Sequence, residues 1–157
     1  MDDRQCPPDD TDNRQRTRYI FGKLLTAEDF EREQEYHRAA LRRHNLALHG
    51  WGVARGFDVV QSSSGAAAVL VSPGYALDPC GREILLTDPV AVPITMNGVS
   101  IVATRACETA VGDDIVRDDV EVAIVPDARS PWVVLASVTA ADDVVVDESV
   151  RRLLRLD

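Results

Sequence analysis

The feature that most constrains the fold is one long helix signal that stops abruptly and is followed almost entirely by strand signals. Thr26 is a good N-cap residue, and Asp29 follows three positions later as a variant of the capping box. Gly50 is typical of the left-handed position just after a helix. Because these start and stop signals agree, we predict a helix over residues 27–49, about 34 Å long at 1.5 Å per residue.

The chain after this helix is a succession of strand and turn signals. Apolar residues alternate over 90–94 and 120–124, and Pro73-Gly74 is typical of a type II turn. We expect the acidic stretch 105–119 to form an irregular surface loop, and residues 147–157 to form a short helix. Roughly seven to nine short strands without intervening helices indicate an α+β class. The predicted architecture is one long N-terminal helix packed on a mainly antiparallel β-sandwich or barrel-like body.

Length and composition predict a single folded domain behind a tail. The chain has 157 residues, of which 45% are hydrophobic, enough for an aliphatic core. Residues 1–17 are polar and acidic overall and include Pro7-Pro8, so we expect a flexible N-terminal tail. The domain is predicted to span residues 18–157.

Charge and hydropathy exclude several classes of partner. The net charge of −9 argues against nucleic-acid binding and against an anionic membrane surface. No apolar run is long enough to span a membrane, and the N-terminus lacks the apolar core of a signal peptide. We therefore expect synthesis and assembly in the cytoplasm, with later release in an extracellular particle left open.

Metal binding and cofactor binding are not indicated by the residues that could support them. His37 and His44 are seven positions apart, about 10 Å along a helix axis, too far to share one metal ion. A hydrolase pairing one of these histidines with Asp78 or Glu83 would need the groups within about 3 Å. The stretch 78–81 instead has the residues of a β-turn. We expect no metal, no cofactor and no enzymatic activity.

The three cysteines, Cys6, Cys80 and Cys107, do not have the spacing of a disulfide framework or a zinc site. Free thiols are the default expectation in a chain of this kind. A bridge between Cys80 and Cys107 is the alternative that sequence cannot test.

The long helix has an unusually polar stripe. Gln34, His37 and Asn45 occupy positions where an ordinary core helix would carry Leu or Ile. One hypothesis is that they are buried and satisfied by backbone groups of the following strands. The other is that they face a second subunit or a polar channel.

Four stretches carry a family likeness: FGKLLTAEDFEREQEYH, LRRHNLALHGWGV, GFDV and PGYALDPCGREI. Together they lie between Phe21 and Ile84 and resemble a widespread prokaryotic domain associated with phage tails and phage-tail-like contractile injection systems. The resemblance implies a structural subunit in the baseplate or fibre-attachment region, with other particle subunits as partners in a homo- or hetero-oligomer. It carries over no catalytic residues.

Candidate interface residues are polar, basic or aromatic side chains on the helix, its entry and the C-terminus. They are Tyr19, Phe21, Gln34, His37, Arg38, His44, Asn45, Trp51, Arg151, Arg152 and Arg155. The alternative function is a ligand- or glycan-binding β-sandwich module. It would need exposed aromatic side chains, for which Trp51, Trp132 and Tyr75 are the candidates.

Overall fold

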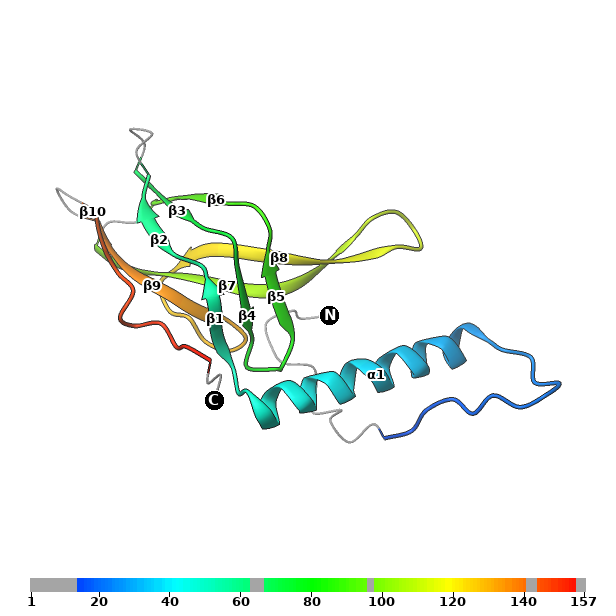
Figure 1. Cartoon of the computed structure of the whole chain (residues 1–157). Coiled ribbons are helices and arrows are strands. Elements are labelled where there is room, and N and C mark those ends of the chain that lie inside the picture. The colour runs from blue at the N-terminus through cyan, green and yellow to red at the C-terminus, as the bar shows by residue number, and fades with distance from the viewer. Residues whose placement is uncertain (1–13, 63–66, 96–97, 141–143, 155–157) are drawn as a thin grey trace.

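The computed structural model describes residues 14–62, 67–95, 98–140 and 144–154 of the chain. Within these ranges one helix precedes ten strands, and all paired strands are antiparallel (Figure 1). The elements are α1 (Ala27–Leu48), β1 (Gly52–Gly56), β2 (Val59–Gln61), β3 (Ala68–Val71), β4 (Gly74–Leu77), β5 (Glu83–Leu86), β6 (Val90–Pro93), β7 (Gly98–Ala110), β8 (Val116–Val125), β9 (Val133–Ala140) and β10 (Val144–Asp147). The predicted α+β class is confirmed.

The helix begins and ends where its capping residues predict. The Thr26 backbone N–H donates a hydrogen bond to Asp29 Oδ2 at 3.3 Å, as in a capping box. At the other end Gly50 adopts φ +74°, and its N–H donates to the Asn45 carbonyl at 3.1 Å. The predicted range is confirmed except for its last residue, because His49 is the C-cap and lies outside the helix.

The first layer is a bent three-stranded antiparallel sheet. The orders β1-β4-β5 and β2-β3-β6 belong to one set of strands, because β1 continues into β2, β3 into β4 and β5 into β6. Hydrogen bonds from Ser72 N–H to the Asp58 carbonyl (2.9 Å) and from Phe57 N–H to the Pro73 carbonyl (3.3 Å) cross the bend. The type II turn predicted at Pro73-Gly74 is therefore wrong, because these residues bend a continuing strand. When the segments on either side of such bends are counted separately, the described residues contain ten strands, above the predicted range of seven to nine.

The second layer is a four-stranded sheet in the order β10-β9-β7-β8. The 13-residue β7 and the 10-residue β8 form a long hairpin, paired from Ile101–Val125 to Ala110–Val116. The loop predicted over residues 105–119 is therefore wrong over most of its length. Arg105 pairs with Glu121 across the two strands at 2.6 Å, so charged residues that resembled a loop serve as cross-strand partners.

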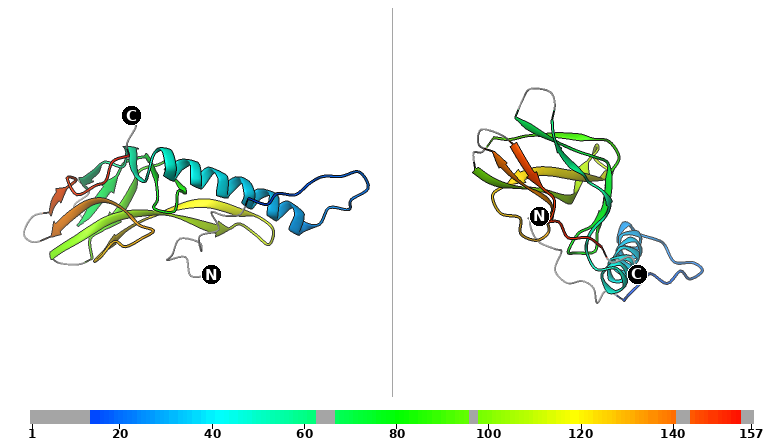
Figure 2. Two further views of the ribbon diagram at one scale, coloured as in Figure 1. Left: turned by 90° about the horizontal axis from the view of Figure 1, so that it is seen from below. Right: turned by 60° about the vertical axis from the view of Figure 1, so that its left-hand side comes forward.

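The two layers face each other, and Figure 2 shows them from two further directions. An aliphatic core lies between them. Val53, Val71 and Ile84 from the first layer belong to the same buried cluster as Val102 and Leu135 from the second. The described strands do not close into a barrel. The facing layers are compatible with the predicted sandwich.

The helix is joined to this body near its C-terminal end. Among the described residues α1 buries only Asp29, Ala39 and Asn45, while Leu41 and Leu48 stay exposed. Figure 1 shows the helix projecting from the body on the same side as the β7–β8 hairpin. Packing of the helix along its whole length would require a continuous apolar stripe, which its polar positions interrupt.

The described residues 147–154 form no helix, so the short helix predicted from residue 147 onward is wrong over them, and the last three positions of that prediction lie outside the described residues. The Val53 N–H donates to the Arg152 carbonyl at 2.8 Å, and the Leu154 N–H donates to the Val53 carbonyl at 2.8 Å. This segment runs parallel to β1 and satisfies backbone groups at its edge. At Gly52 an added Cβ would lie 2.6 Å from the Arg152 carbonyl oxygen, so only glycine permits this approach. Arg155 lies outside the described residues.

Of the two cysteines in the described residues, one departs from the default expectation of thiols. Cys80 is disulfide-bonded, whereas Cys107 keeps its thiol. The two therefore do not bridge each other.

In the part of the chain that the structure describes, no helix is long and apolar enough to cross a membrane.

Candidate interaction surfaces

Residues 14–26, which we call the arm, double back along the first turns of the helix (Figure 1, dark blue to blue). Thr17 is buried, and its hydroxyl donates to the Asp29 carbonyl at 2.8 Å while its N–H donates to Glu33 Oε2 at 3.1 Å. Lys23 Nζ lies 2.6 Å from Asp29 Oδ1, and this hydrogen bond is the main reason that the Asp29 pKa is lowered. The arm is thus fastened to the helix at both of its ends. The structure fixes Thr17, which the sequence assigned to the tail, while residues 1–13 lie outside the described residues.

The outer part of the arm exposes large apolar side chains. Phe21 is fully exposed, Leu24 is 85% exposed, and Tyr19 and Ile20 are more than half exposed. Soluble monomers rarely gather this many exposed apolar groups in so short a stretch, and such patches mark interaction sites. Tyr19 and Phe21 were predicted as interface residues, and both lie on this exposed arm.

The residues of the polar stripe on the helix do not all follow one hypothesis. One is buried with a backbone partner, and others are exposed. Asn45 is buried, and its Nδ2 donates to the Gly81 carbonyl at 2.9 Å, so the satisfied-core hypothesis holds for this residue. Gln34 and His37 are exposed, so the same hypothesis is wrong for them. His37 Nε2 lies 3.3 Å from Glu33 Oε1 on the same helix. The stripe therefore presents polar side chains to the surroundings over its first half. Arg38 and His44 are also exposed.

Residues 108–119, which we call the hairpin tip, form a second projecting surface. Val111, Ile115 and Val116 are each about half exposed or more, and the Val111 N–H closes the turn by donating to the Ile115 carbonyl at 2.7 Å. Arg117 lies 2.8 Å from Asp119, and this hydrogen bond, with that from the Val120 N–H, lowers the Asp119 pKa. Sequence reasoning missed this surface. The signal that could have found it was the apolar pair Ile115-Val116 inside the acidic stretch.

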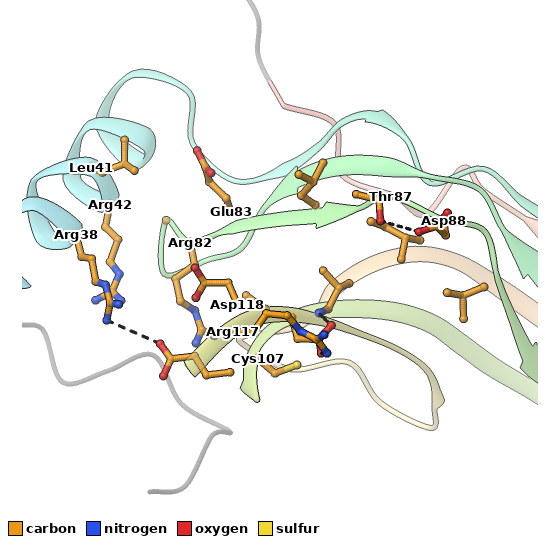
Figure 3. A pocket seen from close by; sticks show the side chains of 18 residues that line it. Arg38, Leu41, Arg42, Arg82, Glu83, Thr87, Asp88, Cys107, Arg117 and Asp118 are labelled. Carbon is orange, nitrogen blue, oxygen red and sulfur yellow. Dashed lines mark hydrogen bonds and ion pairs between the residues drawn. The ribbon is translucent and has the colours of Figure 1, made fainter. Parts of the chain in front are cut away.

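A cavity of about 740 Å³ lies between α1, β5 and the β7–β8 hairpin (Figure 3). Arg38 approaches Glu108 to 4.0 Å across it, which links the helix to the hairpin, and Arg42 pairs with Glu35 at 3.3 Å. Arg82 and Asp118 also line the cavity. Its walls thus mix both signs of charge.

The carboxylates considered for a hydrolase are engaged in structural contacts. Asp78 is fully buried; its Oδ1 accepts the N–H groups of Cys80 and Arg82 at 2.8 Å each, and its Oδ2 accepts Arg82 Nε at 2.7 Å. Glu83 accepts the Tyr75 hydroxyl at 2.9 Å, and burial together with this bond raises the pKa of Tyr75 to about 12. Asp78 therefore serves the turn that its sequence position predicts.

The histidines contact other side chains than these two carboxylates. The rings of His44 and His49 contact each other edge-on with centroids 5.6 Å apart, and the Tyr36 ring packs edge-on against His37. No group of three His, Cys, Asp or Glu side chains in the described ranges could hold a metal ion. The structure does not assemble the histidines and carboxylates into one site.

Both tryptophans are stacked under arginines. The Arg152 guanidinium lies 4.1 Å from the Trp51 ring centroid, and that of Arg105 lies 5.0 Å from the Trp132 ring. Arg151 forms an ion pair with Glu148. Trp51, Arg151 and Arg152 were predicted as interface residues, and their contacts in this chain hold the C-terminal segment against the body.

Comparisons with known proteins find a likeness of fold without a likeness of sequence. No known protein-family model matches the chain, and no curated protein matches its sequence. A crystal structure of TssK matches with a TM-score of 0.58 at 14% identity, over 85% of this chain and 40% of that one. A chain of the baseplate complex from the type VI secretion system matches with a TM-score of 0.56 at 12% identity, over 85% of this chain and 57% of that one. The chain thus spans about half the length of these structures or less, and it shares the fold of that part of them.

Proposed function

We propose that this chain is a structural subunit of a phage-tail-like contractile injection particle, in the baseplate or fibre-attachment region. It acts through protein–protein contacts with other subunits of the particle. The observation that carries the proposal is the arm, which holds large apolar side chains out in solvent at the far end of a helix. A side chain as exposed as Phe21 has no role in the core of this chain, so its role is in contact with another molecule.

Two further observations support the proposal. The fold is shared with part of TssK and with part of a chain from the baseplate complex of the type VI secretion system. The sequence stretches between Phe21 and Ile84 resemble a domain associated with phage tails and contractile injection systems. We propose that the chain is made and assembled in the cytoplasm and acts without catalysis, in keeping with the structural contacts of Asp78 and Glu83.

The alternative of a glycan-binding module gains no support from the aromatic side chains. A sugar platform needs an open aromatic face, whereas one face of Trp51 and one of Trp132 carry an arginine. Tyr75 directs its hydroxyl to Glu83. We therefore retain the structural subunit as the proposal.

The proposal is tested by replacing Phe21 and Leu24 together with serine and measuring how much of the chain enters purified particles. We expect incorporation to fall at least tenfold, because two apolar contacts worth about 1.5–3 kcal/mol each are removed. Val145→Ser is the matched control. Val145 is an apolar side chain that is 60% exposed, but it lies on β10, away from the arm in Figure 1. Particles that lack the chain yet keep a complete baseplate and fibres would contradict the proposal.

A further inference from the structure

The arm is strongly basic although the chain as a whole is acidic. Arg14, Arg16, Arg18 and Lys23 lie between residues 14 and 26, and no Asp or Glu occurs there, while the full chain carries a net charge of −9. Arg16 and Arg18 are exposed beside the apolar side chains of the arm. Lys23 is held by Asp29 at 2.6 Å. The arm therefore offers an apolar surface flanked by positive charge.

The hairpin tip has the opposite combination. It carries one arginine and five acidic residues, which are Glu108, Asp113, Asp114, Asp118 and Asp119. Asp113 and Asp114 are exposed in the turn between Val111 and Ile115. The exposed apolar groups of the tip are thus flanked by negative charge.

The arm and the hairpin tip project at the same end of the molecule and lie apart from each other in Figure 1. Each leaves its apolar groups uncovered within one copy of the chain. We propose that the arm of one copy docks on the hairpin tip of a second copy. The inference rests on the proposed function, for which it names one partner and the surfaces that meet.

The complementary charges around the apolar groups of the arm and the hairpin tip favour a second copy of this chain over an unrelated protein as the partner. The apolar contact supplies affinity, whereas opposite charges at the rim set the register and speed association. Since the arm meets a different surface on its partner, each copy has one of each surface to offer. Such a contact builds a closed assembly where the rotation between copies closes and an open filament where it does not. Like surfaces, arm to arm or tip to tip, would repel.

The first measurement is the mass of the purified full-length chain by sedimentation over a range of concentrations, in low and in high salt. We expect reversible self-association that weakens at high salt, because the screening length falls to about 3 Å at 1 M salt. Phe21→Ser tests the apolar contact alone and is expected to weaken association about tenfold. A chain that stays monomeric at every concentration in low salt overturns the inference.

The second measurement exchanges the charges of the two surfaces. One variant carries Arg16→Glu and Arg18→Glu, and the other carries Asp113→Lys and Asp114→Lys; all four residues are exposed, so folding measured by circular dichroism is expected to stay unchanged. Each variant alone is expected to associate at least tenfold more weakly. An equal mixture of the two should associate again, because the acidic arm of one then matches the basic tip of the other.

The outcomes separate this inference from the proposed function. Association that persists in each charge variant, or a mixture that stays monomeric, overturns the pairing of arm and tip. A self-associating chain that is absent from purified particles contradicts the proposed function and leaves the inference standing. A chain that is found in particles but never self-associates supports the proposed function and overturns the inference.

Discussion

Replacing Asn45 with alanine should loosen the joint between the helix and the body. Asn45 is 6% exposed, and its Nδ2 donates to the Gly81 carbonyl at 2.9 Å, a contact between residues 36 positions apart. Without it, the Gly81 carbonyl loses its side-chain donor at a buried site, which costs about 1–3 kcal/mol. Alanine favours a helix over asparagine by about 0.7 kcal/mol or less, which offsets part of this loss.

The net destabilisation is about 1–2 kcal/mol. For a chain of this length, 1 kcal/mol lowers the midpoint of thermal unfolding by about 2–4 °C, so we expect a fall of about 2–8 °C. Amide hydrogen exchange is the more specific assay, because it reports the opening of each element separately. We expect faster exchange in α1, with the amides of β7 and β9 changing less.

Gln34→Ala is the matched control, since Gln34 is an exposed amide side chain on the same helix. It should change the unfolding midpoint little and leave the exchange of α1 as it is. The reasoning is refuted if Asn45→Ala unfolds at the same temperature as Gln34→Ala and the α1 amides exchange no faster.

Two further predictions concern backbone fit and acid stability. Gly56→Ala places a Cβ 2.1 Å from the Pro73 carbonyl oxygen at φ +62°, whereas Gly112→Ala at φ +96° meets no atom within 4 Å. In urea unfolding, Gly112→Ala should lower the free energy of unfolding by about 1–2 kcal/mol, and Gly56→Ala should lower it by more. The lowered pKa of Asp29 means that its contribution to stability is present above the unfolded value near 3.8 and is lost as the pH falls through the folded value. Asp29→Asn should therefore flatten the decline of stability at acidic pH, and an unchanged decline would contradict the role given to the Lys23–Asp29 pair.

Elements defined by short-range signals could be predicted from the sequence. The helix follows from Thr26, Asp29 and Gly50, whose capping roles act within one turn of the chain. The turn at 78–81 follows from the capacity of an Asp side chain to accept nearby backbone N–H groups. In each case the residues that determine the geometry lie within a few positions of it.

Elements that depend on distant partners could not be predicted. The stretch 105–119 looks like a loop until Arg105 is placed opposite Glu121 and the strand pairing is known. The C-terminal segment has helical apolar spacing, but the free edge of β1 at Val53 offers hydrogen bonds that favour an extended chain. The exposure of the apolar groups on the arm and on the hairpin tip becomes apparent only once both are seen to project from the body.

The way the helix is anchored gives a physical reason for the contact proposed at its far end. Gly81 admits the helix backbone so closely that an added Cβ would lie 2.6 Å from the Arg42 carbonyl oxygen, so the joint lies near one end of α1. From Asn45 back to Ala27 the helix runs about 27 Å. In proteins most of the stability of a helix comes from the packing of an apolar face against other elements. Burying Phe21 and Leu24 against another subunit would contribute about 3–6 kcal/mol, so assembly would stabilise the element that brings the subunits together.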